Sequence, residues 1–350
     1  MFLRIFKYYF SAPILFLLEG IKIRGLLFLL NTVLGEFRTY SLLSRLGGWH
    51  LKIVPMDEQN PFRKKCVCLI FDGRIHQAGL ADCIRGMVAV YNICKGKKID
   101  FKIIYNYPFR LQDFLVPNEY NWQLLDDQKI YCKNDAIDVV CMSKEYLFGK
   151  VNTVLQNKYI HSKLFDSKAS LIRLYSNVHY MGDNYSRDFL HLFKPSALLK
   201  NEIELQQSQI GGKYVSASFR FANLLGDIKD TFGFELDGLQ KRDLIDLCKK
   251  AILDIYNDSN VEKVLVTSDS NSFIRELSEM DFVYVIPGKP GHLGYNGDYE
   301  VVLKTFLDMY MIAQAEKVYM VRTEQMYKSG FAKNASLIYN KPFEEYFIEE

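Results

Sequence analysis

From residue 214 to residue 337, short β-prone apolar runs alternate with segments of helical spacing. Four runs have the near-continuous apolar character of strands buried in a parallel sheet: 214–219, 263–267, 282–286 and 317–321. Four segments have the apolar spacing of helices: 242–256, 271–280, 299–315 and 332–337. This alternation predicts consecutive βα units, and therefore an α/β fold in this half of the chain.

A similar series precedes residue 200. A strand at 65–71, a helix at 80–94 and a strand at 101–105 form a βαβ unit within about 40 residues. A strand at 137–141, a helix at 188–193 that stops before Lys194-Pro195, and a helix at 198–209 follow. We therefore expect two Rossmann-like lobes facing a cleft, at 61–200 and 201–350.

Residues 1–60 predict an N-terminal helical extension. The apolar runs Tyr8–Leu18 and Leu26–Leu34 are both shorter than the ~20 residues that a spanning helix needs, and Lys22 and Arg24 lie between them. We interpret them as helices lying on the inner face of a membrane, with the basic residues toward anionic lipid. A signal peptide and a helical hairpin packed on the protein's own core are the alternatives.

Composition limits the partners. The net charge of the 350 residues is only +3, which does not indicate a nucleic-acid partner. The 7 cysteines are scattered, and Cys66 and Cys68 lack the second pair that a zinc site would need. Reduced thiols in a cytoplasmic protein are the expected state.

Arg220 directly follows the run 214–219, and Gly226-Asp227 comes a few residues later. A strand that ends in an arginine and a glycine-containing loop places a guanidinium at the carboxyl edge of a sheet, where open α/β sheets bind their ligands. Planar paired donors suit phosphate oxygens. The alternative is a surface strand that ends in a solvated arginine.

Three other segments place polar groups at strand ends or helix starts. They are Gly79 with Asp82, Asp269 with Ser270, and Ser329-Gly330-Phe331. Glycine lets a ligand approach the backbone, and helix-start amides attract anions. Taken singly, Asp82, Asp269 and Ser329 are equally explained as helix-start or capping residues.

As an ordered set, these segments resemble the motifs of the fucosyltransferase superfamily, which includes α1,2-, α1,6- and protein O-fucosyltransferases. Residues 79–86 resemble its N-lobe glycine motif, and Ser218-Phe219-Arg220 with Gly226-Asp227 resembles its His-x-Arg-x-Gly-Asp motif. Thr267-Ser268-Asp269-Ser270 is similar to its Thr-Asp-Ser/Asp strand end, and Ser329-Gly330-Phe331 to its Ser-x-Phe-Ser helix start. The resemblance covers roughly residues 66–340.

The resemblance implies a GT-B fold and inverting transfer of fucose from GDP-fucose without a metal ion. Arg220 would then hold the β-phosphate, Asp269 with Ser270 would contact the nucleoside, and Ser329 with the Gly330 and Phe331 amides would hold phosphate. Asp82 and Asp227 are the candidates for the general base. No Asp-x-Asp, the usual metal–diphosphate clamp of the other glycosyltransferase fold, occurs in the sequence.

The two N-terminal apolar runs suggest a bacterial enzyme. An enzyme at the cytoplasmic face of the inner membrane would act on a glycan or lipid-linked oligosaccharide acceptor in surface polysaccharide synthesis. His292 lies in a glycine-rich loop and would contact donor or acceptor; the simpler alternative is a solvated loop histidine.

Three positions depart from the family's pattern. Ser218 occupies the histidine position, Ala81 replaces a glycine, and the stretch between Arg220 and Gly226 is longer than in the family. Two alternatives therefore stay open: a transferase that uses another GDP-sugar, and a non-catalytic relative that binds a nucleotide sugar or glycan. A dehydrogenase would need a G-x-G-x-x-G fingerprint after a strand, which is missing.

Overall fold

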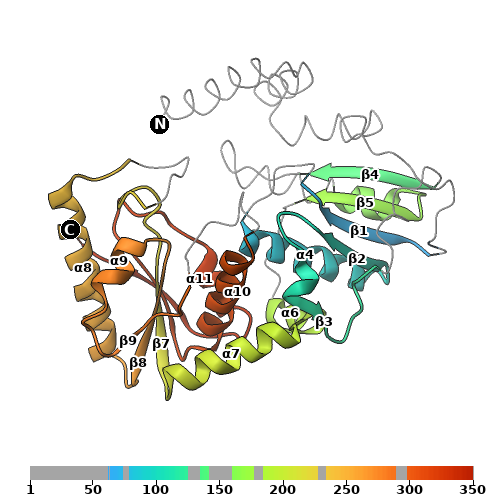
Figure 1. Ribbon diagram of the computed structural model, residues 1–350. Helices are drawn as coiled ribbons and strands as arrows, with labels where there is room; N and C mark the ends of the chain where they lie inside the picture. Colours follow the sequence, from blue (N-terminus) through green and yellow to red (C-terminus); the bar gives the residue numbers. More distant parts are fainter. Residues whose placement is uncertain are drawn as a thin grey trace. The chain divides into compact units, whose positions relative to one another are not determined.

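A computed structural model describes residues 62, 64–73, 79–124, 135–141, 160–176, 184–227, 234–288 and 298–349 (Figure 1). The chain divides into two compact units. Unit 1 comprises Met1–Gln77, Ala89–Tyr105 and Trp122–Tyr180; unit 2 comprises Ala78–Val88, Asn106–Asn121 and Met181–Glu350. The predicted N-terminal extension and His292 lie outside the described residues. The lobe boundaries at 61–200 and 201–350 stay predictions.

Unit 1 is built on a four-stranded parallel sheet in the order β2-β1-β5-β4. Its strands are β1 (Cys66–Phe71), β2 (Asp100–Tyr105), β4 (Ala136–Cys141) and β5 (Leu171–Ser176). Every residue of β1 is buried, as its continuous apolar sequence requires of an inner strand. Asp138 and Arg173 are paired across β4 and β5, and Arg173 Nε lies 2.6 Å from Asp138 Oδ1.

Unit 2 is built on a five-stranded parallel sheet in the order β11-β10-β7-β8-β9. Its strands are β7 (Tyr214–Phe219), β8 (Lys263–Ser268), β9 (Val283–Tyr284), β10 (Val318–Arg322) and β11 (Phe343–Phe347). Because β7 is the central strand and all five strands are parallel, the segments that follow β7, β8 and β10 share one edge of the sheet. The α/β fold class predicted from the sequence is confirmed, with parallel sheets in both units.

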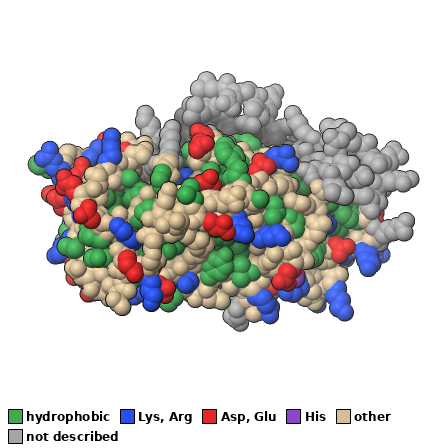
Figure 2. All heavy atoms as spheres, turned by 60° about the horizontal axis from the view of Figure 1, so that its bottom comes forward, with side chains coloured by type: hydrophobic (Ala, Val, Ile, Leu, Met, Phe, Trp, Pro, Cys, Tyr) green, Lys and Arg blue, Asp and Glu red, His purple; other side chains and the backbone are tan. Residues whose placement is uncertain are grey.

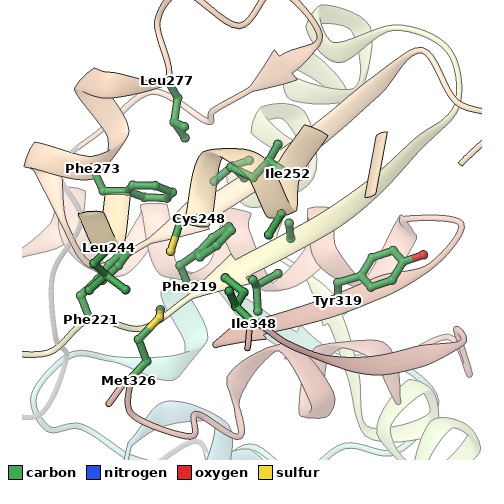
Figure 3. Close-up of a cluster of buried hydrophobic side chains, with 14 of the residues drawn as sticks. Phe219, Phe221, Leu244, Cys248, Ile252, Phe273, Leu277, Tyr319, Met326 and Ile348 are labelled. Atoms are coloured by element: carbon green, nitrogen blue, oxygen red, sulfur yellow. The ribbon is translucent and has the colours of Figure 1, made fainter. Parts of the chain in front are cut away.

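One face of the unit 2 sheet is covered by α8 (Gly238–Asn257) and α9 (Asn271–Glu276) (Figure 1). Helix α8 begins with a capping box in which the Asp237 side chain accepts from the Gln240 amide at 2.9 Å. Its apolar side joins a buried cluster that includes Phe219, Phe221 and Phe273 (Figure 3). The Phe273 ring lies 4.9 Å from each of the other two rings, so this core reaches the carboxyl end of β7.

The opposite face is covered by α10 (Tyr299–Gln314), and α11 (Phe331–Ser336) lies beside it (Figure 1). Successive β7 side chains point to opposite faces, and the Tyr214 hydroxyl donates to the Met311 carbonyl of α10 at 2.8 Å. On α10 itself a buried ion pair joins Lys304 to Asp308 at 2.5 Å. Helix α7 (Ala197–Ile210) also packs against α10.

Further elements lie outside the two parallel sheets. They are α4 (Leu80–Gly96), α6 (Tyr185–Leu192), the short helix η2 (Leu111–Asp113), and the antiparallel strands β3 (Leu115–Pro117) and β6 (Phe193–Pro195). None of the helices in the described ranges is both long and apolar enough to cross a membrane. The segment Ala78–Val88, which includes the first part of α4, belongs to unit 2.

The structure corrects several predicted boundaries. Helix α8 begins four residues before the predicted Arg242, because the capping box at Asp237 starts it. The predicted helix 271–280 ends at Glu276, and the predicted strand 282–286 is paired only over Val283–Tyr284. The helical prediction at 188–193 was wrong for Phe193, which belongs to β6.

Candidate functional site

Arg220 and Asp269 meet at the carboxyl edge of the unit 2 sheet. Arg220 follows β7 and Asp269 follows β8, and these neighbouring strands are in register up to Phe219 and Ser268. Arg220 Nη1 lies 3.0 Å from Asp269 Oδ2, and the two side chains are 17% and 6% exposed. The two residues that the sequence placed separately at strand ends therefore form one ion pair.

The Asp269 carboxylate also holds the backbone that follows Arg220. Its Oδ1 accepts from the Phe221 amide at 2.8 Å, and its Oδ2 accepts from the Ala222 amide at 2.9 Å. Ala222 has a φ of 52°, in the left-handed region that an alanine rarely adopts. These bonds fix the turn and thereby the position of the guanidinium.

Opposing effects act on the Asp269 carboxyl. Burial raises its pKa above the ordinary value, because removal from water disfavours the charged form. The Arg220 charge and the two amides act in the opposite direction, since they stabilise the carboxylate, but burial is the larger effect.

Asp227 lies at the start of α9. Its carboxylate accepts from the Ser270 hydroxyl and, at 2.8 Å, from the Ser272 hydroxyl. The Ser270 hydroxyl in turn accepts from the Phe273 amide at 3.0 Å, as the N-cap of α9. Asp227 therefore ties the loop after β7 to the beginning of α9, and Ser270 serves the helix cap.

Asp82 and Gly79 lie at the start of α4. The Asp82 amide donates to the Gly79 carbonyl at 3.0 Å, and the Asp82 side chain is 44% exposed. Arg85, one turn further along, lies 3.8 Å from Asp82 and donates to Asn334 Oδ1 at 3.2 Å. Because Asn334 belongs to α11, this contact joins the Asp82 segment to the Ser329-Gly330-Phe331 segment.

Ser329 and Phe331 contact each other at the start of α11. The Phe331 amide donates to the Ser329 hydroxyl at 3.2 Å, while Gly330 is exposed. The Tyr327 amide donates to the Arg220 carbonyl at 3.3 Å, which brings the connection after β10 to the end of β7. Arg220 and Asp269 thus form a contact pair at the sheet edge, Asp227 joins it through Ser270, and Asp82 is connected to α11 through Arg85.

Sequence reasoning found no partner for Ser218 and gave no role to Arg85 or Asn334. The Ser218 hydroxyl lies 2.8 Å from the Thr267 hydroxyl, so the serine at the expected histidine position has a partner on the next strand. Arg85 carried a usable signal, because it lies one helical turn after Asp82. Asn334 carried none, since its contact with Arg85 spans 249 positions of sequence.

Charges of both signs are interspersed on the face shown in Figure 2, in keeping with a net charge of +3. Within the described ranges, no group of three or more His, Cys, Asp or Glu side chains is placed to hold a metal ion. Cys66, Cys68, Cys83, Cys94 and Cys248 are free and buried.

The fold and the sheet-edge site define an α/β protein with two parallel sheets and a cation at the carboxyl end of the central strand of one sheet. No protein-family model and no curated protein sequence matches the chain.

Solved structures with this fold include the α-1,6-fucosyltransferase NodZ soaked with GDP-fucose, at a TM-score of 0.53 and 12% identity. The likeness covers 79% of this chain and 93% of that one. NodZ co-crystallised with GDP gives the same values, and another structure of NodZ from Bradyrhizobium gives a TM-score of 0.51 at 12% identity, over 79% and 94% of the two chains. The chain therefore shares the fold of a fucosyltransferase.

Proposed function

We propose that this protein is an inverting glycosyltransferase of GT-B architecture that moves fucose from GDP-fucose to a glycan acceptor without a metal ion. The observation that carries the proposal is the Arg220 guanidinium at the end of β7, held at 3.0 Å by Asp269. The shared fold supports it, because a structure with that fold was obtained from crystals soaked with GDP-fucose.

The chemistry needs a fixed positive charge. The acceptor oxygen bonds to the sugar carbon as the bond from that carbon to the diphosphate oxygen breaks, so negative charge builds on the leaving GDP. A guanidinium that is already positioned stabilises this charge more in the transition state than in the ground state. Arg220 is positioned in this way, because Asp269 holds both the guanidinium and the amides of the next two residues.

The acceptor hydroxyl must also lose a proton, and a carboxylate can take it. Asp82 and Asp227 are the two candidates. The Asp227 oxygens already accept from Ser270 and Ser272, whereas Asp82 is 44% exposed on the first turn of α4. We favour Asp82 as the base and assign Asp227 to holding the loop after β7.

Ser329, with the Gly330 and Phe331 amides, and Gly79 would complete the donor site, and Asp269 with Ser270 would line its nucleoside side. We place the reaction at the cytoplasmic face of a bacterial inner membrane, with residues 1–60 on the membrane surface. The acceptor would be a glycan or lipid-linked oligosaccharide of surface polysaccharide synthesis.

A second candidate function is a non-catalytic relative that binds a nucleotide sugar. Ser218 favours it, because the serine hydroxyl is engaged with Thr267 where the fucosyltransferase motif has a histidine. A third candidate keeps catalysis but uses another GDP-sugar.

Nucleotide binding tests the donor class. Isothermal titration calorimetry with GDP, UDP and CMP should show binding of GDP alone. Arg220→Gln removes the charge but leaves an amide that can donate to Asp269, and it should weaken GDP binding by about 10-fold or more. The matched control is Arg242→Gln on the exposed side of α8. Binding of UDP but not GDP would overturn the donor assignment.

A further inference from the structure

Lysines gather at the amino edge of the unit 1 sheet, where its strands begin. Cys66, the first residue of β1, pairs with Asp100 and Leu171, the first residues of β2 and β5. Adjacent strands lie about 4.8 Å apart, so the entries to the four strands span about 15 Å. The segments that enter the strands are therefore close enough to form one surface of unit 1.

This surface carries an excess of positive charge. The described segments that enter the strands, together with the first residue of β2, contain seven lysines and three aspartates: Lys64, Lys65, Lys95, Lys97, Lys98, Lys163 and Lys168, with Asp100, Asp135 and Asp166. This excess of four charges compares with a net charge of +3 for the whole chain, so all other residues together sum to −1. Five of the lysines are exposed, and we call them the amino-edge lysines: Lys64, Lys95, Lys97, Lys98 and Lys168.

Contacts join the segments that precede β1, β2 and β5. Lys65 Nζ donates to the Leu164 and Ser167 carbonyls, at 3.2 and 2.7 Å, and so ties the segment before β5 to the start of β1. Lys97 Nζ lies 5.2 Å from the centre of the Phe165 ring, which brings the segment before β2 to the same place. The lysines before these three strands therefore share one continuous surface.

The end of α4 shows that local folding does not account for all of these lysines. The Ile99 amide donates to the Cys94 carbonyl at 3.0 Å, and the Lys98 amide donates to the Lys95 carbonyl at 3.2 Å. This is the pattern of a Schellman motif, in which glycine is the usual residue at the position of Lys98. Lys98 has a φ of 56°, a left-handed conformation that costs free energy for a residue with a side chain. A lysine at a position that favours glycine indicates a role for its side chain.

We propose that the amino-edge lysines contact an anionic lipid surface, so that unit 1 binds a membrane through this edge of its sheet. Closely spaced lysines suit a surface of many negative charges, which the headgroups of acidic lipids provide. Residues 1–60 lead into this edge through Phe62 and Lys64. The proposed function already places residues 1–60 on a membrane, and this contact rests on that placement but not on the identity of the donor.

Sedimentation with lipid vesicles tests the contact in the full-length protein. Vesicles of phosphatidylcholine alone are compared with vesicles that also contain phosphatidylglycerol, which is anionic. The edge variant removes three amino-edge charges together: Lys95→Gln, Lys97→Gln and Lys98→Gln. The matched control changes the net charge equally by removing three exposed lysines of unit 2: Lys194→Gln, Lys213→Gln and Lys250→Gln.

We expect the edge variant to bind the anionic vesicles about 10-fold or more weakly than the wild type, since each lysine near an anionic bilayer contributes about 5-fold. The control should bind as the wild type does. The difference should disappear with neutral vesicles and shrink at high salt, because salt screens exposed charges. Lys98→Gly should weaken binding to anionic vesicles without lowering the melting temperature, because glycine suits the left-handed position.

Edge and control variants that bind the anionic vesicles equally would overturn the contact. A wild type that binds RNA or a soluble anionic polysaccharide through these lysines, but not the vesicles, would also overturn it, because the partner would be of another class. Calorimetry with GDP separates the contact from the donor assignment. A wild type that binds vesicles through the amino-edge lysines but binds no GDP would leave the contact standing and overturn the donor, and normal GDP binding without vesicle binding would do the reverse.

Discussion

Arg220 and Asp269 form an ion pair of 3.0 Å between the ends of two adjacent parallel strands. Each residue follows its strand directly, so the register of β7 and β8 alone brings them together. The Asp269 carboxylate accepts from two backbone amides as well, which makes it the point that fixes the turn after β7.

Removal of the Asp269 carboxylate should destabilise the protein. Asp269→Ala removes one partner of the 17% exposed Arg220 and the acceptor of two backbone amides, and we expect a loss of about 3–5 kcal/mol in the free energy of unfolding. Asp243→Ala, at an exposed position of α8, should change it by less than about 0.5 kcal/mol. Urea denaturation followed by circular dichroism measures both. Equal midpoints for the two variants would contradict the role assigned to Asp269.

Titration of Asp269 should contribute to the pH dependence of the free energy of unfolding. Because burial raises its pKa in the folded protein, the folded state binds this proton more tightly than the unfolded state does. The contribution of this group is fully present below its unfolded-state pKa and is lost as the pH rises through its folded-state pKa.

The free energy of unfolding of the wild type, minus that of Asp269→Asn, should therefore decrease with rising pH across that window. Urea titrations at pH values from about 3.5 to 7 measure this difference. A difference that grows with pH would mean that the pairing with Arg220 outweighs burial.

Substitutions at the two candidate bases, Asp227 and Asp82, should have different effects on stability and on turnover. Asp227→Ala removes the acceptor of Ser270 and Ser272, and we expect it to lower the free energy of unfolding by about 1 kcal/mol. Asp82→Ala, at a 44% exposed side chain, should leave stability nearly unchanged but abolish most transfer from GDP-fucose. Retained transfer in Asp82→Ala together with loss in a folded Asp227→Asn would reverse the assignment.

The buried thiols should be protected in the native protein. Burial raises the pKa of Cys66 and of Cys248 to about 12, so almost none of either is thiolate at pH 8. Iodoacetamide at pH 8, followed by peptide mass spectrometry, should label both only after addition of denaturant. Rapid labelling of Cys248 in folded protein would show that α8 does not pack as described.

The strands around the site were predictable because their sequences are apolar almost without interruption. Strand β7 was predicted with its observed bounds, and β8 and β10 to within one residue at each end. Two strands of the parallel sheets, β5 and β11, were missed because they contain charges. In β5, Arg173 is balanced by Asp138 on the neighbouring strand; in β11, Glu345 pairs with Arg322 and Lys328. These partners lie far apart in sequence, so a local pattern does not reveal them.

The residues of the site could be predicted from the sequence, but most of their contacts with one another could not. Arg220, Asp269 and Ser329 could be picked out because each lies just past a strand or just before a helix. Their contacts depend on strand register and on helix packing, and a local stretch of sequence determines neither. The contact between Arg85 and Asn334 is the clearest example.

The most direct test of the account is the release of GDP from GDP-fucose by wild type and Arg220→Gln, measured with a mixture of bacterial glycan acceptors. Arg242→Gln serves as the control for the loss of an arginine. We predict turnover in wild type and control, and a rate at least about 100-fold lower in Arg220→Gln, because its guanidinium would stabilise the leaving diphosphate. Equal rates in wild type and a folded Arg220→Gln would contradict the account.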